Sequence, residues 1–391
     1  MDRFTAAERA LRQAAPHALL QAVQDVLTQH YGAVSVDLLM ADYAMTILQP
    51  VSALPYTGEP ISVYQSSPGR AFGAQQPYVE NDDRTGQLTA HLPISVRGDR
   101  IGVLTVRLPR DLYDAQAEHE LQDVAEVLGH EIVVGERDTD VYLQARRANR
   151  LTLAAEMQWQ LLPGRSCSRP EYEIGAQLEP AYAIYGDNFD WSASASHLTL
   201  VVTNGMGEGI EAALLTNLAV NALRNARRAG LSLADQACLA DQAVYGHYHG
   251  QVYLSTLLLL FDVETGQTQI VDAGSPRMWR LRHGKAEQIQ LEAQLPLGMF
   301  EDTLYTAEPF QVEPGDRLVF VSDGVYNVAS PAGEPYSEKA LIRALTNTRL
   351  LPASQVPRAV LQELAGHRGP IDADDDAMVV CLDWRGSQKT E

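Results

Sequence analysis

Four groups of acidic or amide side chains stand at the ends of apolar runs that are typical of buried strands. Hard divalent cations such as Mg²⁺ and Mn²⁺ prefer oxygen ligands of this kind. Strand ends can converge at one rim of a sheet, so residues far apart in sequence could form one site. The groups are Asp187 and Asp190, Asn204 after Leu198–Thr203, Asp323 after Leu318–Ser322, and Asp374, Asp375 and Asp376 before Met378–Leu382.

A cluster of carboxylates would need cations, because like charges repel one another when they are gathered together. Two divalent ions about 3.5–4 Å apart can clamp a phosphoryl group and activate a bridging water. Such a reaction requires no Cys or Ser nucleophile. The alternative for each residue alone is a plain turn, since Asp and Asn before Gly are ordinary turn residues.

The segment from about Pro170 to Trp384 is rich in predicted strands and also contains long amphipathic helices. Many antiparallel strands with a few helices favour a sandwich of sheets flanked by helices. The predicted strands are Leu198–Thr203, Tyr253–Val263, Gln267–Ala273, Met278–Leu281, Arg317–Ser322 and Met378–Leu382, and the predicted helices are Ile210–Ala229, Leu233–Tyr245 and Ser354–Leu364.

The first segment, to about Leu108, has the order helix, strand pair, variable middle and strand hairpin, which predicts an α+β domain with an antiparallel sheet. The predicted elements are a helix over Ala14–Tyr31, strands over Ala33–Met40 and Ala44–Leu48, and a hairpin of Leu88–Val96 with Arg100–Leu108.

A helical region over about Asp114–Leu162 joins the two segments. From Val141 to Leu162 the apolar and small residues alternate steps of four and three, which resembles a heptad seam. The seam predicts either a helix packed on its own domain or a dimerising helix between two domains.

The composition excludes several classes of protein. The formal net charge of −20 disfavours a chain that binds nucleic acid or anionic membranes through a basic face. The three cysteines form no CxxC pair, so we expect no disulfide framework or zinc site. The sequence lacks a long apolar span and a signal-peptide pattern, and we therefore expect a cytoplasmic protein.

An ordered series of motifs from about Leu151 to Leu382 resembles the protein phosphatase 2C-like (PPM) family, in the group typified by SpoIIE and RsbU. The series is highly specific because its members occur in order over most of the second segment. The motifs are Ala155–Gln158 with Leu161–Pro163, Tyr185–Asp190, Asn204–Gly209 with Ala212–Leu214, Asp272–Gly274, Leu297–Met299, Pro314–Asp316, Ser322–Val325 and the aspartates before Met378.

The resemblance implies a central β-sandwich with helices outside and a site for two Mn²⁺ or Mg²⁺ ions. Asp187 would lie in the shell of metal and water, and Asn204 would bridge the metals beside the carbonyl of Gly205. Asp323 would bind one metal. The strand alignment selects Asp374 as the last ligand, with Asp375 as the one-residue alternative.

Several residues depart from the family pattern. Asn204 stands where the family has a bridging Asp, and a neutral amide with one oxygen bridges cations poorly. Other departures are Tyr185 for a Gly, Ser275 for a His and Asn327 for an acidic residue. Classical members have a histidine at the position of Met206, whereas SpoIIE-like members have a methionine there, as this sequence does. The resemblance therefore implies a protein serine/threonine phosphatase acting on a phosphorylated partner, with a pseudophosphatase that serves as a binding module as the alternative.

The first segment resembles a GAF domain, through Ser67–Phe72 and Val96–Leu104. GAF domains often bind small molecules, so we expect a sensor that regulates the phosphatase.

The expected partner is a STAS-type anti-sigma factor antagonist, and the expected assembly is a homodimer. We expect the GAF-like domain over 1–112, a helical linker over 113–163, the phosphatase domain over 164–385 and a disordered tail over 386–391.

Overall fold

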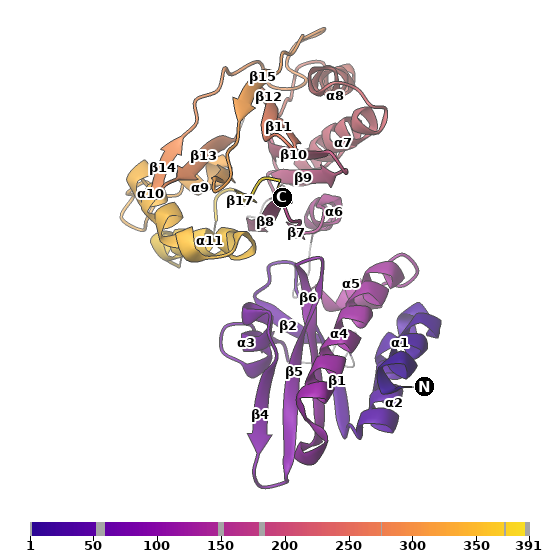
Figure 1. Cartoon of the computed structure of the whole chain (residues 1–391). Coiled ribbons are helices and arrows are strands. Elements are labelled where there is room, and N and C mark those ends of the chain that lie inside the picture. Colours follow the sequence, from indigo (N-terminus) through magenta and orange to yellow (C-terminus); the bar gives the residue numbers. More distant parts are fainter. Residues whose placement is uncertain are drawn as a thin grey trace. The chain divides into compact units, whose positions relative to one another are not determined.

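The computed structural model describes residues 2–51, 59–147, 152–179, 184–274, 276–370 and 373–387. The chain divides into two compact units, residues 1–150 and residues 151–391 (Figure 1). Within the described residues, no helix is long and apolar enough to cross a membrane.

The first unit is built on a six-stranded antiparallel sheet of order β3-β2-β1-β6-β5-β4. Its strands are β1 (Ser35–Ala41), β2 (Ile47–Pro50), β3 (Ile61–Ser62), β4 (Tyr78–Asp82), β5 (Gln87–Val96) and β6 (Asp99–Pro109). Its helices are α1 (Arg3–Gln13), α2 (Leu19–Tyr31), α3 (Ser67–Ala74), α4 (Ala115–Gly135) and α5 (Val141–Ala145).

Helices cover both faces of this sheet, because the side chains of β1 alternate between two cores. Leu38 and Met40 belong to the larger core, together with residues of α1, α2 and α4. Leu39 and Ala41 belong to the smaller core, where α3 contributes Phe72. The predicted strand pair, the predicted hairpin and the α+β class are confirmed.

The first predicted helix begins later than expected. Ala14 and Ala15 are extended, a short 3₁₀ turn follows at Pro16–Ala18, and α2 starts only at Leu19. The proline explains the delay, since it disfavours helical backbone in the residue before it. The predicted stop is confirmed, because Gly32 ends α2 in the left-handed conformation at φ +68°.

The predicted heptad seam from Val141 to Leu162 is wrong as a single helix. α5 ends at Ala145, and α6 (Leu153–Leu161) begins anew at Thr152, whose side chain caps the helix by accepting from the Ala155 N–H. Ala145 is buried in the core of the first unit. Spacing alone predicted the seam, and small apolar residues at such spacing also suit helices packed within separate units. Ala148 lies outside the described residues.

The second unit contains two antiparallel sheets, of order β15-β12-β11-β10-β9 and β14-β13-β16-β17-β8-β7. The strands of the first sheet are β9 (Asn188–Ala193), β10 (His197–Asn204), β11 (Ser255–Asp262), β12 (Gln267–Ala273) and β15 (Glu308–Gln311). The strands of the second sheet are β7 (Ser166–Ser168), β8 (Tyr172–Glu179), β13 (Arg277–Arg282), β14 (Lys285–Gln288), β16 (Arg317–Val321) and β17 (Ala377–Trp384).

The two sheets form a sandwich, and the Phe261 ring of β11 stacks on Trp384 of β17 with centroids 5.7 Å apart. Helices α7 (Gly209–Arg228) and α8 (Leu233–Tyr248) pack on the five-stranded sheet, and α10 (Glu338–Asn347) and α11 (Val356–Arg368) pack on the six-stranded sheet (Figure 1). A single turn of helix, α9 (Asp323–Tyr326), follows β16. The expected sandwich flanked by helices is confirmed.

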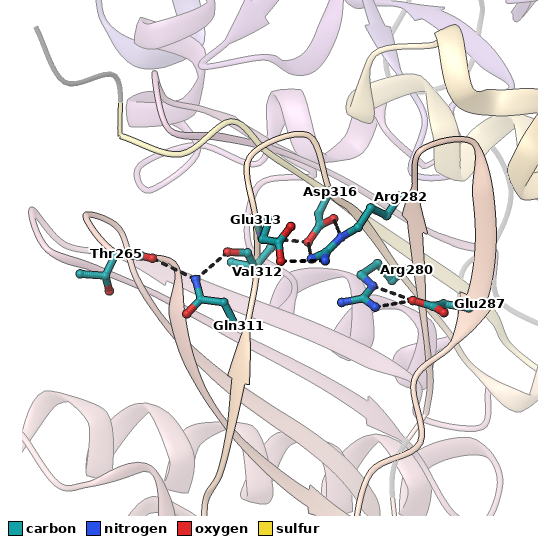
Figure 2. A network of polar contacts seen from close by, with 8 residues as sticks. All are labelled: Thr265, Arg280, Arg282, Glu287, Gln311, Val312, Glu313 and Asp316. Carbon is teal, nitrogen blue, oxygen red and sulfur yellow. Dashed lines mark hydrogen bonds and ion pairs between the residues drawn. The ribbon is translucent and has the colours of Figure 1, made fainter.

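Ion pairs close one end of this sandwich (Figure 2). Arg282, at the end of β13, donates to both carboxylate oxygens of Asp316 at 2.6 and 2.7 Å and pairs with Glu313 at 2.8 Å. Arg280 donates to Glu287 on the neighbouring strand β14. The bidentate Arg282–Asp316 pair fixes geometry as well as contributing charge, and Asp316, Glu313 and Glu287 are each paired with an arginine.

Candidate functional site

The predicted site residues lie at the opposite ends of the same strands. Thr203 of β10 pairs with Asn188 of β9, so Asn204 and Asp187 lie next to each other at the same end of these two strands of the five-stranded sheet. Val321 of β16 pairs with Val379 of β17. Asp323 and the residues just before Ala377 therefore lie at the same end of these two strands of the six-stranded sheet. These strand ends from the two sheets meet, because the side chains of Asn204 and Asp323 form a hydrogen bond with each other.

Asn204 joins the two sheets through its amide group. Its Nδ2 donates to Oδ1 of Asp323 at 3.1 Å. Its Oδ1 is buried and has no hydrogen-bond partner among the described residues. Because a buried acceptor without a partner costs free energy, this oxygen is a candidate ligand for a cation.

Asp187 is buried, with 2% of its surface exposed. Its Oδ1 accepts from the Gly205 N–H at 3.2 Å, and its buried Oδ2 has no hydrogen-bond partner in the described part of the chain. Burial raises the pKa of Asp187 well above its ordinary value, and the charges of Asp376, Asp323 and Asp375 raise it further. Asp187 is therefore poorly suited to carry a negative charge unless a cation is present.

The carboxyls of Asp323 and Asp375 share this electrostatic environment. Burial raises the pKa of Asp323. Burial and then the charge of Asp323 raise the pKa of Asp375 to about 7. Asp374 is exposed. Of the two alternatives for the last ligand, Asp375 is the half-buried one, and its charge acts on the pKa of Asp187.

Asp376, to which the family resemblance assigns no role, holds the loop that carries Asp187. Its Oδ2 accepts from the backbone N–H groups of Tyr185 and Gly186, each at 3.0 Å, and of Asp187 at 3.4 Å. The Gln158 side chain of α6 donates to the same oxygen at 2.9 Å and to the Asp187 carbonyl at 2.8 Å. Asp376 is fully buried and positions the site rather than lining it. Its one sequence signal is its place as the last aspartate before an apolar strand.

Two glycines let the backbone close around the site. A Cβ on Gly205 would lie 2.1 Å from the Tyr185 carbonyl oxygen, and a Cβ on Gly324 would lie 1.9 Å from that of Asp376. Neither gap admits a side chain, so glycine is required at both positions.

Asp190 lies apart from this group and has a structural role. Its two oxygens pair with Arg224 at 2.8 Å and with Arg227 at 3.0 Å. These contacts tie β9 to α7. The six residues predicted as catalytic or metal-binding therefore separate into a cluster of Asp187, Asn204, Gly205, Asp323 and Asp375, with Asp374 outside it.

The cluster does not form a finished metal cage. Within the described residues, no group of three or more His, Cys, Asp or Glu side chains is arranged so that it could hold a metal ion. The two orphaned buried oxygens and the raised carboxyl pKa values nevertheless fit a cation, because a positive charge would satisfy the oxygens and favour ionised carboxylates.

Comparisons with known proteins identify the domain that forms most of the second unit. A family model described as Stage II sporulation protein E (SpoIIE) matches residues 194–385. The Phosphoserine phosphatase RsbU of Bacillus subtilis is 22% identical over 264 residues, which are 67% of this chain and 77% of RsbU. This region is a SpoIIE PP2C-type phosphatase domain, homologous to RsbU and SpoIIE, so the predicted resemblance is confirmed.

Other matches are more partial. Protein IcfG of Synechocystis sp. is 23% identical over 265 residues, which are 59% of this chain and 41% of IcfG, so the chain spans less than half of that relative. The solved RsbU and RsbW domains of a Mycobacterium tuberculosis protein match with a TM-score of 0.49 and 22% identity, over 56% of this chain and 61% of that one. Similar structures at TM-scores of 0.44 and 0.40 were solved with magnesium and with two manganese ions.

The positions that depart from the SpoIIE family pattern can now be placed. Tyr185 is half-buried in the loop held by Asp376, and Asn327 is exposed after α9. Met206 packs against the core between α7, α8 and the five-stranded sheet, so it serves packing. Ser275 lies outside the described residues. Asn204 remains the departure that bears most directly on the chemistry of the cluster.

Proposed function

We propose that the second unit is a metal-dependent protein serine/threonine phosphatase that acts on a phosphorylated signalling partner. The observation that carries this proposal is the convergence of Asp187, Asp323 and Asp375 around Asn204, with raised carboxyl pKa values and two buried oxygens lacking partners. Perturbed carboxyls gathered at one site are a common mark of function.

Cations would be held by oxygens of this chain. The donors are one carboxylate oxygen each from Asp187, Asp323 and Asp375, the Asn204 Oδ1 atom and the Gly205 carbonyl. When bound, Mn²⁺ or Mg²⁺ would supply an activated water and the positive charge that a transferring phosphoryl group needs. The residues themselves fix where that charge lies: Asp376 and Gln158 hold Asp187 in place, and the Asn204 amide orients Asp323.

A binding module without catalytic activity is the second candidate, and the Asn204–Asp323 hydrogen bond favours it. An amide nitrogen faces Asp323 where the family has a carboxylate. With an amide in place of a carboxylate, the cluster has one negative charge fewer. The remaining carboxylates therefore repel one another less, even when no cation is bound. Such a site needs metal less and binds it more weakly.

Release of phosphate from a phosphoserine peptide, measured with the full chain in Mn²⁺ and in EDTA, tests the proposal. We expect release in Mn²⁺ that EDTA abolishes and that Asp323→Asn reduces by at least about a hundredfold. Inert native protein together with an active Asn204→Asp variant would instead establish the binding module.

The remaining assignments belong to the same proposal. The first unit would act as a GAF-like sensor for a small molecule, and the substrate would be a STAS-type anti-sigma factor antagonist in the cytoplasm. The motifs Ser67–Phe72 and Val96–Leu104 and the antiparallel sheet of the first unit support the sensor. We further propose a homodimer, which the mass of the full chain in solution tests: a mass that stays that of one chain at all concentrations contradicts it.

A further inference from the structure

Arg277 is the first residue of β13 and lies at the same end of the six-stranded sheet as Asp323. It pairs in register with Val321 of β16, and Asp323 follows Val321 by two residues. The backbone therefore brings a guanidinium group to the rim where Asp323 stands.

The side chain of Arg277 is held there by an aromatic ring. Its guanidinium carbon lies 3.7 Å from the centroid of the Tyr326 ring, a close cation–π contact. Tyr326 and Asp323 are the last and first residues of α9, and residues three apart on a helix lie on neighbouring positions of its surface. The guanidinium is thus stacked on the residue that ends the helical turn begun by Asp323.

Arg277 differs from the other arginines of its sheet in its charge partners. Arg280 pairs with Glu287, Arg282 with Asp316 and Arg317 with Asp383. Among the described residues, Arg277 forms no ion pair with a carboxylate, although it is only half-buried in a chain of net charge −20. A guanidinium that stacks by its face has its N–H donors at its edge, where an anion can bind.

We propose that Arg277 binds the non-bridging oxygens of the substrate phosphoryl group. This inference rests on the proposed function, because it gives that site its anion-binding residue. A planar guanidinium can donate two parallel hydrogen bonds to a phosphate, which a lysine cannot match. The carboxylates of the cluster repel a phosphate dianion, so a cation at the same end of the sheet would offset that repulsion and orient the phosphoryl group.

Binding of inorganic phosphate tests Arg277 without requiring turnover. Isothermal titration calorimetry with the full chain in Mg²⁺ would compare the native protein with Arg277→Gln, Arg277→Lys and Arg280→Gln. Arg280 is a matched control, because it is an arginine of the same strand whose partner is Glu287 (Figure 2). Thermal unfolding of each variant verifies that it is folded.

We expect Arg277→Gln to weaken phosphate binding by about tenfold or more, Arg277→Lys to recover part of the loss, and Arg280→Gln to bind as the native protein does. Equal binding by native protein and Arg277→Gln would overturn the inference, as would native protein that binds no phosphate. If Arg277→Gln unfolds, Tyr326→Leu keeps the arginine and removes its support; unchanged binding in that variant overturns the inference.

The proposed function can fail separately. A native chain that releases no phosphate from a phosphoserine peptide, but binds phosphate through Arg277, contradicts the phosphatase and leaves this inference in place. In an active enzyme, Arg277→Lys should raise KM for that peptide, whereas Arg280→Gln should leave both KM and kcat unchanged.

Discussion

The side-chain nitrogen of Asn204 donates a hydrogen bond to Oδ1 of Asp323, and this contact joins the ends of β10 and β16, which belong to different sheets. An aspartate at position 204 could not make it, since two carboxylates at 3.1 Å would repel each other unless a cation lay between them. The residue at 204 therefore sets how strongly the folded protein depends on metal.

Replacing Asn204 by aspartate should make the protein more dependent on metal. We expect Asn204→Asp to lower the free energy of unfolding in EDTA by about 1–3 kcal/mol, because it adds a partly buried charge beside Asp323. Mn²⁺ should reverse this loss and bind more tightly than to the native protein. Chemical unfolding in EDTA and calorimetric Mn²⁺ titration provide the two measurements. The control is Asn225→Asp, the same change at an exposed position of α7; equal effects at both positions would contradict the account.

Asp376 should be far more important for stability than its neighbour Asp374. Asp376→Ala leaves the backbone N–H groups of Tyr185, Gly186 and Asp187 without their buried acceptor. We expect the second unit to lose about 3 kcal/mol of stability. Asp374→Ala, two residues away and exposed, should change it by less than about 0.5 kcal/mol. Similar unfolding midpoints for the two variants would show that Asp376 does not hold the loop.

Asp375 and Asp374 should respond differently to metal. At about 100 times its dissociation constant, a bound ion stabilises the folded state by about 2.7 kcal/mol. We expect Asp375→Asn to remove most of the rise in thermal unfolding temperature that Mn²⁺ produces, and Asp374→Asn to retain it. A Mn²⁺ response lost only in Asp374→Asn would instead support the first sequence alignment.

A pH dependence is expected at Asp241, a buried carboxyl of α8 outside the candidate site. It accepts from the Gly298 N–H at 2.8 Å and from the Tyr305 hydroxyl at 3.1 Å, and burial raises its pKa above 3.8. A raised folded-state pKa stabilises the fold below the unfolded value, and this stabilisation is lost as pH rises through the folded value. Asp241→Asn cannot ionise, so its stability relative to native protein should rise as pH increases above about 4. A difference in unfolding free energy that is constant from pH 4 to pH 8 would contradict this assignment.

The sequence predicted the parts of the fold that depend on local patterns. The apolar runs that end at Asn204 and Asp323 were visible because a buried strand followed by a turn has a distinct composition. Strand β8 was missed because its residues mix polar and apolar types. Its Gly175 faces the Ala353 carbonyl oxygen, which a Cβ would approach to 2.1 Å, and no sequence pattern reveals such a contact.

The members of the candidate site could be proposed from the sequence, but the contacts that support them could not. The Gln158–Asp376 hydrogen bond spans 218 positions of the chain, so no local spacing could indicate it. The choice between Asp374 and Asp375 depends on which side chain turns inward, and a one-residue shift at a strand end changes the face on which it lies. Arg277 was missed for a related reason, because its partner Tyr326 comes from a different element.

Anomalous scattering from crystals of the full chain grown in Mn²⁺ tests the central claim most directly. We predict manganese bound between Asp187, Asp323 and Asp375, within ligand distance of the Asn204 Oδ1 atom, in the native protein. Crystals at saturating Mn²⁺ that show no manganese at these residues, or manganese only elsewhere, would contradict the account.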